Sequence, residues 1–379
     1  MRAAAELRSG GYTGALDLVG AETGPPYDRP PLSKQVLLGE VDSVPLEAGW
    51  LAGVDVHPGR VATGLSPGVL ATSGGELRWD GLVLAAGAVP RRLAGSDGSA
   101  HVLRTLADAH RLRSSLLPGA RVVVVGAGWI GAEVATVAAR RGCAVTVLEA
   151  GPAPLGVALG PAAGARTARW YAEAGIELRT GTAVSKVDSR GVGPAGPGRV
   201  DADVVVEAVG VRPDLGWLAG SGVDVDQASG GAVVDASCRT TLSGVVAVGD
   251  CAARWSPRVG ARVRTEHWDD ALHAPEVAAA TLLGGDAVYD PVPYVWSEQF
   301  GRYLQWVGWR TGDRPAVWRG DPAGAGGWAA AWLDADGRLT GLLAVDRPRD
   351  AVQARRAIDA GRVVSPGRLA DPAVPVKAA

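Results

Sequence analysis

Hydrophobic positions follow their clearest pattern between Arg121 and Ala150. A near-continuous apolar run over 121–125 predicts a buried strand, and a second run over 144–148 predicts another. The segment between them is expected to be a helix. Strand, helix and strand in this order predict a βαβ unit, in which a helix connects two parallel strands.

A glycine-rich turn separates the first of these strands from the helix. Gly126 permits the tight turn, Gly128 lets the backbone approach a pyrophosphate, and Gly131 lets the helix pack on the strand. The helix N-terminus offers N–H groups and a positive dipole end to the phosphates. Glu149 follows the second strand, where a carboxylate accepts from the ribose hydroxyls and repels a 2′-phosphate. The sequence therefore predicts an NAD(H) site rather than an NADP(H) site.

The same pattern recurs in weaker form. Residues 15–19 predict a strand that is followed by Glu22, as the second strand above is followed by Glu149. Residues 79–93 and 201–215 also match one another, each as a buried strand that runs into a Gly turn and a Pro. We therefore expect two related nucleotide-binding halves, the second inserted within the first.

The first half begins partway along its helix. Its own strand and glycine turn would then lie before Met1. We expect the sequence to be truncated there, most simply through a misplaced start. The alternative is a domain that never had this loop.

Elsewhere the pattern predicts shorter elements. They are the end of a helix over 1–13, an extended Pro-rich loop rather than a helix over 24–38, hairpin strands over 54–79 with turns at 58–59 and 73–75, a loop over 151–160, a helix over 166–174, a Gly/Pro hairpin turn over 191–198 and a helix over 264–283. From Tyr289 tryptophans cluster and strands alternate, so we expect a domain of β-hairpins with a closing helix over 351–358 and a tail from Pro366.

Composition narrows the classes of partner. The net charge of −2 leaves no polybasic footprint for nucleic acid or a membrane surface. No apolar run approaches the roughly 18 residues of a membrane span. The three cysteines, Cys143, Cys238 and Cys251, form no closely spaced pair, so neither a metal site nor a redox disulfide is expected from adjacent cysteines. We expect a cytoplasmic protein, monomeric or weakly dimeric, in a reducing compartment.

Six segments in order carry a resemblance to one family. They are YDRPPLSK (27–34), VGAGWIGAE (125–133), VGVRPD (209–214), TTLSGVVAVGDC (240–251), TEHWDDAL (265–272) and WSEQFGRYLQWVG (296–308). Over essentially its whole length the chain resembles the FAD-dependent, NADH-using ferredoxin reductases of the pyridine nucleotide-disulfide oxidoreductase superfamily. These enzymes serve bacterial cytochrome P450 and Rieske-type ring-hydroxylating oxygenases, as putidaredoxin and rhodocoxin reductases do.

The resemblance implies an α/β fold with two Rossmann-like domains and a C-terminal α+β domain. The FAD-binding domain would comprise residues 1–103 and 231–288, the NAD-binding domain residues 104–230, and the C-terminal reductase domain residues 289–379. The implied activity is hydride transfer from NADH to FAD, followed by single-electron transfer to a [2Fe–2S] ferredoxin. FAD would connect the two-electron donor NADH with the one-electron acceptor, since flavin takes two electrons and the cluster takes one.

The resemblance also implies which residues bind the cofactors. Glu22 would hold the FAD ribose, Val61 would lie near the adenine, and Asp250 would bond the ribityl or pyrophosphate region. The other residues implied to contact FAD are Arg29, Lys34, Arg104 and Trp268, and those assigned to nucleotide binding are Gly126, Gly128, Gly131, Glu149 and Gly210. The family's usual Ala-Thr-Gly at the first strand end is Ala-Ala-Gly over 85–87 here, which loses one hydroxyl.

Three residues are the candidates for chemistry. In the family, the counterpart of Lys34 approaches flavin N5 and pairs with that of Glu133, which would stabilise the reduced, anionic flavin and help to orient nicotinamide. The alternative is an exposed loop lysine and a surface glutamate. Trp296 resembles an aromatic that lies over the flavin–nicotinamide site, or else packs in a Trp-rich core. His267 is interpreted as structural or substrate-adjacent, because hydride transfer requires no general base.

Two other functions stay open. An NADH oxidase or disulfide-type reductase would need a redox cysteine near the flavin, and the segment beside Lys34 contains none. A flavin-free NAD-binding protein would follow if the N-terminal half had lost FAD.

Overall fold

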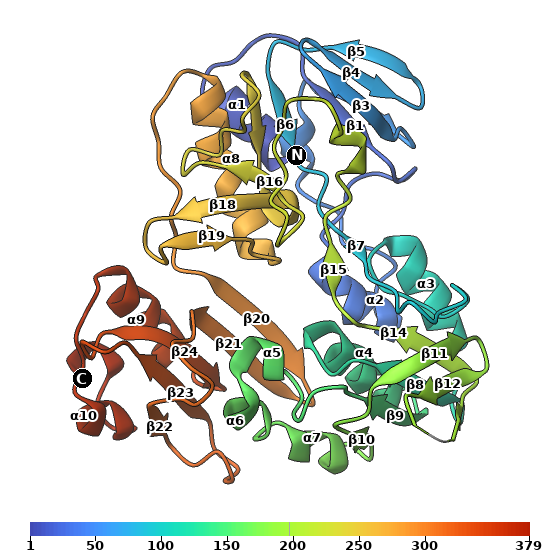
Figure 1. Ribbon diagram of the computed structural model, residues 1–379, viewed down its shortest axis with the longest axis vertical. Coiled ribbons are helices and arrows are strands. Elements are labelled where there is room, and N and C mark those ends of the chain that lie inside the picture. Colours follow the sequence, from blue (N-terminus) through green and yellow to red (C-terminus); the bar gives the residue numbers. More distant parts are fainter. Residues whose placement is uncertain (197) are drawn as a thin grey trace. The chain divides into compact units, whose positions relative to one another are not determined.

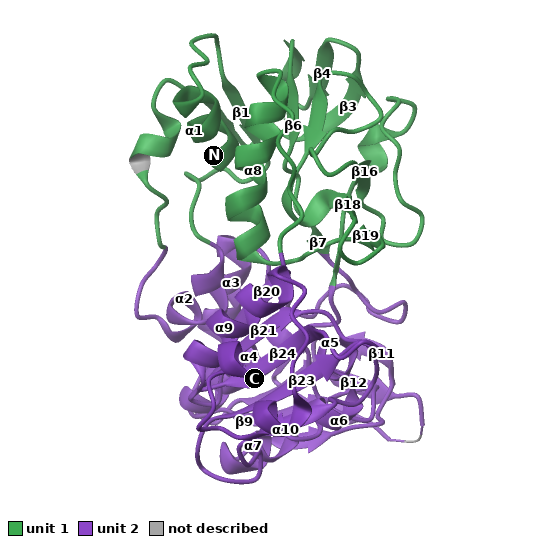
Figure 2. Cartoon of the chain, turned by 90° about the vertical axis from the view of Figure 1, so that its left-hand side faces the viewer, with its two compact units in different colours: residues 1–28, 44–89, 211–291 green, residues 29–43, 90–210, 292–379 purple. Residues whose placement is uncertain are grey.

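The computed structural model (Figure 1) describes residues 1–196 and 198–379. The chain forms two compact units, each built from three separate segments, as the two colours of Figure 2 show. Unit 1 comprises residues 1–28, 44–89 and 211–291, and unit 2 comprises residues 29–43, 90–210 and 292–379. The three predicted domain boundaries stay a prediction, whereas the mixed α/β class is confirmed.

Unit 1 combines α-helices and short 3₁₀ helices, labelled η, with small sheets. Its elements in chain order are α1 (Arg2–Ser9), β1 (Asp17–Gly20), η2 (Ala48–Leu51), β2 (Asp55–Pro58), β3 (Ala62–Ser66), β4 (Val69–Thr72), β5 (Gly75–Arg78), β6 (Leu82–Leu84), η3 (Gly216–Leu218), β16 (Ala232–Val234), β17 (Val245–Ala247), η4 (Gly249–Cys251), β18 (Ala252–Ser256), β19 (Ala261–Val263) and α8 (Trp268–Leu282). Parallel pairs join β1 to β2 and β6 to β17, and β3, β4 and β5 form an antiparallel meander. The short strands β7 (Val89–Pro90) and β15 (Val211–Arg212) occur where the chain passes between units.

The first part of unit 2 contains the predicted βαβ unit. Its elements are η1 (Pro30–Ser33), α2 (Gln35–Leu38), α3 (Leu106–Ser115), β8 (Arg121–Val125), α4 (Trp129–Arg140), β9 (Ala144–Leu148), α5 (Gly156–Leu159), α6 (Pro161–Gly164), α7 (Ala168–Glu173), β10 (Glu177–Arg179), β11 (Val184–Asp188), β12 (Gly191–Pro194), β13 (Val200–Asp201) and β14 (Val204–Glu207). Four parallel strands form a sheet in the order β10-β9-β8-β14. Both strands of the βαβ unit have the bounds that the apolar pattern predicts.

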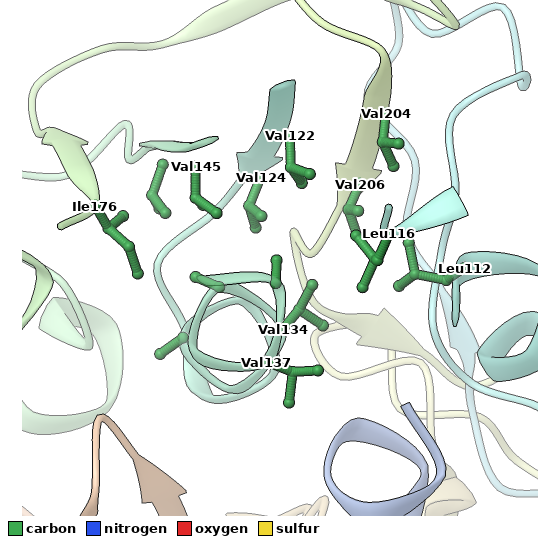
Figure 3. Packing of buried hydrophobic residues seen from close by; sticks show 14 of the residues in the cluster. Leu112, Leu116, Val122, Val124, Val134, Val137, Val145, Ile176, Val204 and Val206 are labelled. Atoms are coloured by element: carbon green, nitrogen blue, oxygen red, sulfur yellow. The ribbon is translucent and has the colours of Figure 1, made fainter. Parts of the chain in front are cut away.

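The two strands of the βαβ unit, β8 and β9, are nearly continuous apolar runs because both faces of their sheet are covered. Along β8, Val122 and Val124 belong to the cluster on the α4 side, whereas Val123 and Val125 belong to a second cluster. Each fully buried valine contributes about 1.5–3 kcal/mol relative to an exposed one. Figure 3 shows the valines of three strands gathered over α4, namely Val122, Val124, Val145, Val204 and Val206, with Val134 and Val137 on the helix.

The last part of unit 2 is a five-stranded antiparallel sheet in the order β20-β21-β24-β23-β22. Its elements are β20 (Tyr294–Gln299), β21 (Arg302–Gly308), β22 (Val317–Arg319), β23 (Trp328–Leu333), β24 (Leu339–Val345), α9 (Pro348–Asp359), α10 (Pro366–Ala370) and η5 (Val376–Ala378). Side chains alternate between two clusters: Leu342 packs toward α9, and Leu343 packs with Trp328 and with Trp170 of α7. The tryptophans therefore attach this sheet to the nucleotide-binding part of the same unit.

Several predicted elements are wrong in extent or kind. Residues 24–38 contain η1 and α2, because Pro30 and Pro31 occupy the first positions of a helical turn, where no donor is needed. Pro58-Gly59 is no hairpin turn, since β2 pairs with β1 in parallel. The segment predicted as a tail from Pro366 forms α10 and η5, with Leu369 and Val376 fully buried.

Other differences concern element ends. The helix expected over 264–283 begins at Trp268, because β19 extends to Val263. The loop expected over 151–160 contains the short helix α5. The turn predicted over 191–198 includes residue 197, which lies outside the described residues. Within the described part of the chain, the structure contains no helix that is long and apolar enough to cross a membrane.

Candidate functional site

The glycine turn in unit 2 has one side open to a ligand. Gly126 has φ +100°, and a Cβ there would overlap the carbonyl oxygen of Ala208. A Cβ on Gly131 would overlap the carbonyl oxygen of Gly126. A Cβ on Gly128 would meet nothing within 4 Å. Gly126 and Gly131 are thus required by the fold, whereas the space beside Gly128, at the N-terminus of α4, is open, as the predicted diphosphate site requires.

Glu149 is already part of this turn. Its Oε2 accepts a hydrogen bond from the Ala127 N–H at 2.8 Å, and its Oε1 accepts one from the Gly151 N–H at 2.7 Å. An ionised carboxylate has about four lone-pair sites, so two remain for ribose hydroxyls. The carboxylate therefore holds the loop in place as well as offering the charge that discriminates between nucleotides. Its contact with NAD(H) stays a prediction.

Wild-type protein is expected to prefer NADH to NADPH by at least about tenfold in kcat/KM, equivalent to roughly 1.4 kcal/mol. Glu149→Ala should lower kcat/KM for NADH and narrow this ratio, because both the charge and the loop contacts are lost. Glu177→Gln, at an exposed glutamate of the neighbouring β10, is the matched control and should keep the ratio. Steady-state kinetics with both donors measures the effect, and equal kcat/KM values in the wild type would contradict it.

A buried ion pair lies farther along the same helix. Glu133 of α4 is 3 % exposed, and its Oε2 lies 2.8 Å from Nζ of Lys34. Lys34 Nζ also lies 4.9 Å from the centroid of the Trp296 ring, in the range of a cation–π contact. Since both partners are largely buried, the alternative of an exposed lysine and a surface glutamate is wrong. The roles of the three residues in chemistry stay a prediction.

Two serines complete the surroundings of this carboxylate. Ser33 donates to Oε2 of Glu133, and Ser297 of β20 donates to Oε1. Gln299 Nε2 in turn donates to Ser297 Oγ at 2.9 Å. Sequence reasoning missed all three. One signal was available. Positions 297 and 299 are two residues apart and so lie on the same face of a strand, and a Ser and a Gln that are buried there require hydrogen-bond partners.

The other residues assigned to FAD divide between the units. In unit 2, Arg29 donates to the carbonyl oxygen of Arg104 at 2.7 Å. In unit 1, Glu22 follows the end of β1 and accepts from the Tyr27 hydroxyl at 2.6 Å. Asp250 lies in η4, directly after β17, at the carboxyl end of a parallel strand where ligands of α/β folds bind.

The remaining predicted positions are near the surface or at element ends. Val61 and Trp268 are exposed, and Trp268 Nε1 donates to Asp28 Oδ1 at 2.9 Å. Gly210 has φ +95° and accepts from the Arg91 N–H through its carbonyl. His267 is the N-cap of α8 and accepts from the backbone of Asp269, which is a structural role. Contact of Val61, Trp268 and Gly210 with a cofactor stays a prediction.

A buried acid in unit 1 makes stability depend on pH. Burial raises the pKa of Asp270 in α8 from its ordinary 3.8 to about 6. Asp250 and Asp269 raise this pKa further, whereas Arg254, with Nη2 at 3.6 Å, and Tyr289 lower it in part. The folded state therefore retains a proton that the unfolded chain has lost.

The stability that Asp270 contributes is fully present below its unfolded pKa and is lost as pH rises through about 6. We expect the difference in unfolding free energy between wild type and Asp270→Asn to fall by roughly 2–3 kcal/mol between about pH 4 and pH 7. Urea unfolding of both proteins across this interval measures the difference. A difference that is constant with pH would contradict the assignment.

Comparison with known proteins identifies the class. Residues 1–274 match the pyridine nucleotide-disulphide oxidoreductase family, and residues 294–379 match the reductase C-terminal family. The chain belongs to the pyridine nucleotide-disulphide oxidoreductase family and is an oxidoreductase. The family uses FAD and NAD(H), which confirms both predicted cofactors.

Relatives and solved structures narrow the class further. The ferredoxin–NAD(+) reductase component of the anthranilate 1,2-dioxygenase system of Burkholderia cepacia is 37 % identical, with 99 % of this chain and 95 % of the relative covered. Rhodocoxin reductase of Rhodococcus erythropolis is 34 % identical, with 93 % and 86 % covered. The crystal structure of the covalent putidaredoxin reductase–putidaredoxin complex superposes with a TM-score of 0.92 at 31 % identity, covering 99 % of this chain and 94 % of that one. The resemblance to this group of ferredoxin reductases is confirmed.

Proposed function

We propose that the protein transfers hydride from NADH to FAD and passes single electrons on to a small [2Fe–2S] ferredoxin, which feeds a P450 or ring-hydroxylating oxygenase. The observation that carries this proposal is that one helix, α4, presents both the open glycine turn at Gly128 and the buried Glu133–Lys34 pair. The relatives that reduce ferredoxins for oxygenases support the choice of acceptor. A cytoplasmic location is part of the proposal and is supported by three free cysteines.

The side chains described above suit the NAD(H) site and part of the FAD site. FAD, when bound, accepts the two electrons of a hydride and releases them one at a time. Lys34 supplies a positive charge, and the buried carboxylate of Glu133 holds that charge in one position. Trp296 gives the ammonium an aromatic face. Gly128 and Glu149 would hold NAD(H), and Glu22 and Asp250 would hold hydroxyl groups of FAD.

Thiol chemistry is disfavoured by the state of the cysteines. Burial raises the pKa of the Cys238 thiol to about 12 and that of Cys251 to about 11, and burial also raises the pKa of Cys143. Thiolates, the reactive form, are therefore scarce at neutral pH. All three cysteines are free. A persulfide reductase of the same fold is only 22 % identical and supports the fold alone.

We expect the combined variant Cys143→Ser, Cys238→Ala, Cys251→Ala to reduce ferredoxin and cytochrome c at nearly the wild-type rate. Alanine replaces the two buried thiols because a buried serine hydroxyl would need a new partner. The measurement is NADH-dependent turnover at matched flavin content. Loss of turnover in a folded, flavin-loaded variant would favour the disulfide-type reductase instead.

The flavin itself separates the proposed enzyme from a flavin-free NAD-binding protein. Purified protein is expected to be yellow, with the absorbance of an oxidised flavin that NADH bleaches under anaerobic conditions. Colourless protein that binds NADH and cannot be loaded with FAD would overturn the proposal.

A further inference from the structure

We propose that Ser297, directed by Gln299, is a positioning residue that fixes the carboxylate of Glu133 and, through it, the ammonium of Lys34. This inference rests on the proposed function, because it concerns how the Lys34–Glu133 pair is held for flavin reduction. The contact joins the C-terminal sheet to the helix of the βαβ unit within unit 2.

Hydrogen-bond direction supports the assignment. Ser297 and Gln299 are each 1 % exposed, and they lie on the same face of β20. Gln299 Nε2 donates to Ser297 Oγ at 2.9 Å and so occupies a lone pair of the hydroxyl. The single hydroxyl proton of Ser297 is then directed to Oε1 of Glu133. Gln299 thus determines which way Ser297 donates.

The two carboxylate oxygens are divided between separate segments of the chain. Oε2 receives Lys34 and Ser33, which are adjacent in sequence. Oε1 receives Ser297 from the C-terminal sheet. With one oxygen anchored on each side, the carboxylate plane cannot rotate, and the ammonium stays beside it. A merely structural serine would bury its hydroxyl against a backbone carbonyl, as Thr340 does against Trp332 in the same sheet.

Loss of the Ser297 hydroxyl therefore lets the carboxylate turn away from Lys34. A misplacement of a reacting group by about 1 Å can reduce rates by about 10²-fold. This effect should act on the reduction step rather than on NADH binding.

The experiment is anaerobic stopped-flow reduction of the FAD-loaded protein over a range of NADH concentrations. Ser297→Ala should lower the limiting rate by about tenfold to hundredfold and leave the NADH dissociation constant nearly unchanged. Ser297→Thr keeps the hydroxyl and should restore the rate. Thr340→Val removes a buried hydroxyl from the same sheet and should leave the rate unchanged.

Variants of Glu133 separate the possible failures. A Glu133→Gln protein that reduces its flavin at the wild-type rate would overturn the proposed role of the ion pair itself. If Glu133→Gln reduces its flavin slowly but Ser297→Ala matches the wild-type limiting rate, the positioning role alone is overturned. The same holds if Ser297→Ala slows reduction equally in the wild-type and Glu133→Gln backgrounds, since coupled residues are not additive.

A second variant and a cofactor-free measurement guard against a failure to fold. Gln299→Leu retains the Ser297 hydroxyl but no longer directs it, and it should lower the limiting rate by a smaller factor than Ser297→Ala does. In apoprotein, Ser297→Ala should lower the unfolding midpoint in urea with Glu133 present and have little effect in a Glu133→Leu background. Equal shifts in both backgrounds would contradict the contact.

Discussion

Replacing Lys34 with Met slows the reduction of bound flavin by NADH by about 10²-fold, the size of effect expected when one preorganised charge is removed from a reacting centre. Met retains the unbranched side chain that passes the Trp296 ring and removes only the ammonium. Glu133 then lies buried without its cation, so a neutral ion pair becomes a net negative charge, which disfavours a reduced, anionic flavin. We expect the content of FAD to fall much less than the rate. Anaerobic stopped-flow absorbance, normalised to flavin content, measures both quantities.

Lys186→Met is the matched control, because Lys186 is an exposed lysine on β11 of the same unit. It should reduce its flavin at the wild-type rate. If Lys34→Met loses FAD while the remaining flavin is reduced normally, Lys34 serves only to bind the cofactor. That result would remove the chemical role assigned to the ion pair.

Replacing Arg319 with Met is expected to destabilise the C-terminal part of unit 2 by about 3–5 kcal/mol, the range for removing one partner of a buried ion pair. Arg319 is 2 % exposed and its Nε lies 2.8 Å from Oδ2 of the buried Asp350. Its guanidinium also donates to backbone carbonyls of the last segment, including those of Leu369 and Val374. The substitution leaves these carbonyl acceptors unpaired and releases the segment that covers the sheet, whereas Asp350 keeps Arg347 as a second partner at its Oδ2.

Urea unfolding followed by tryptophan fluorescence measures this loss, since Trp328 and Trp332 lie in the core of the same sheet. Arg338→Met, at an exposed pair with Asp336, is the control and should have little effect. An Arg319→Met transition that coincides with the control would show that the buried guanidinium does not hold the segment.

Local pattern was sufficient for the nucleotide-binding part of the fold. The strands at 121–125 and 144–148 match because each is a nearly continuous apolar run beside its own turn. The contacts of Glu133 could not be obtained in this way, since Ser33 and Ser297 lie 100 and 164 residues away in the chain. Periodicity tells which face of a strand is buried but not which residue lies opposite it.

The C-terminal segment shows a second limit of pattern. Residues from Pro366 have few large apolar side chains and two further prolines, so they carry no period that predicts a helix. The segment is ordered by contacts with the rest of the unit. The Arg319 guanidinium donates to its backbone carbonyl groups, and Leu369 and Val376 pack beside the sheet. Arg319 lies in β22, four elements before α10, so no signal within the segment itself contains it.

The central claim, that two electrons from NADH leave singly to a ferredoxin, is tested most directly by an anaerobic titration. Flavin-loaded protein in catalytic amount is mixed with excess oxidised [2Fe–2S] ferredoxin and limiting NADH, and the reduced cluster is quantified by its absorbance and its electron paramagnetic resonance signal. We predict two reduced ferredoxins for each NADH consumed, because the donor gives an electron pair and the cluster takes one electron. Flavin that NADH reduces fully while the ferredoxin stays oxidised would contradict the account.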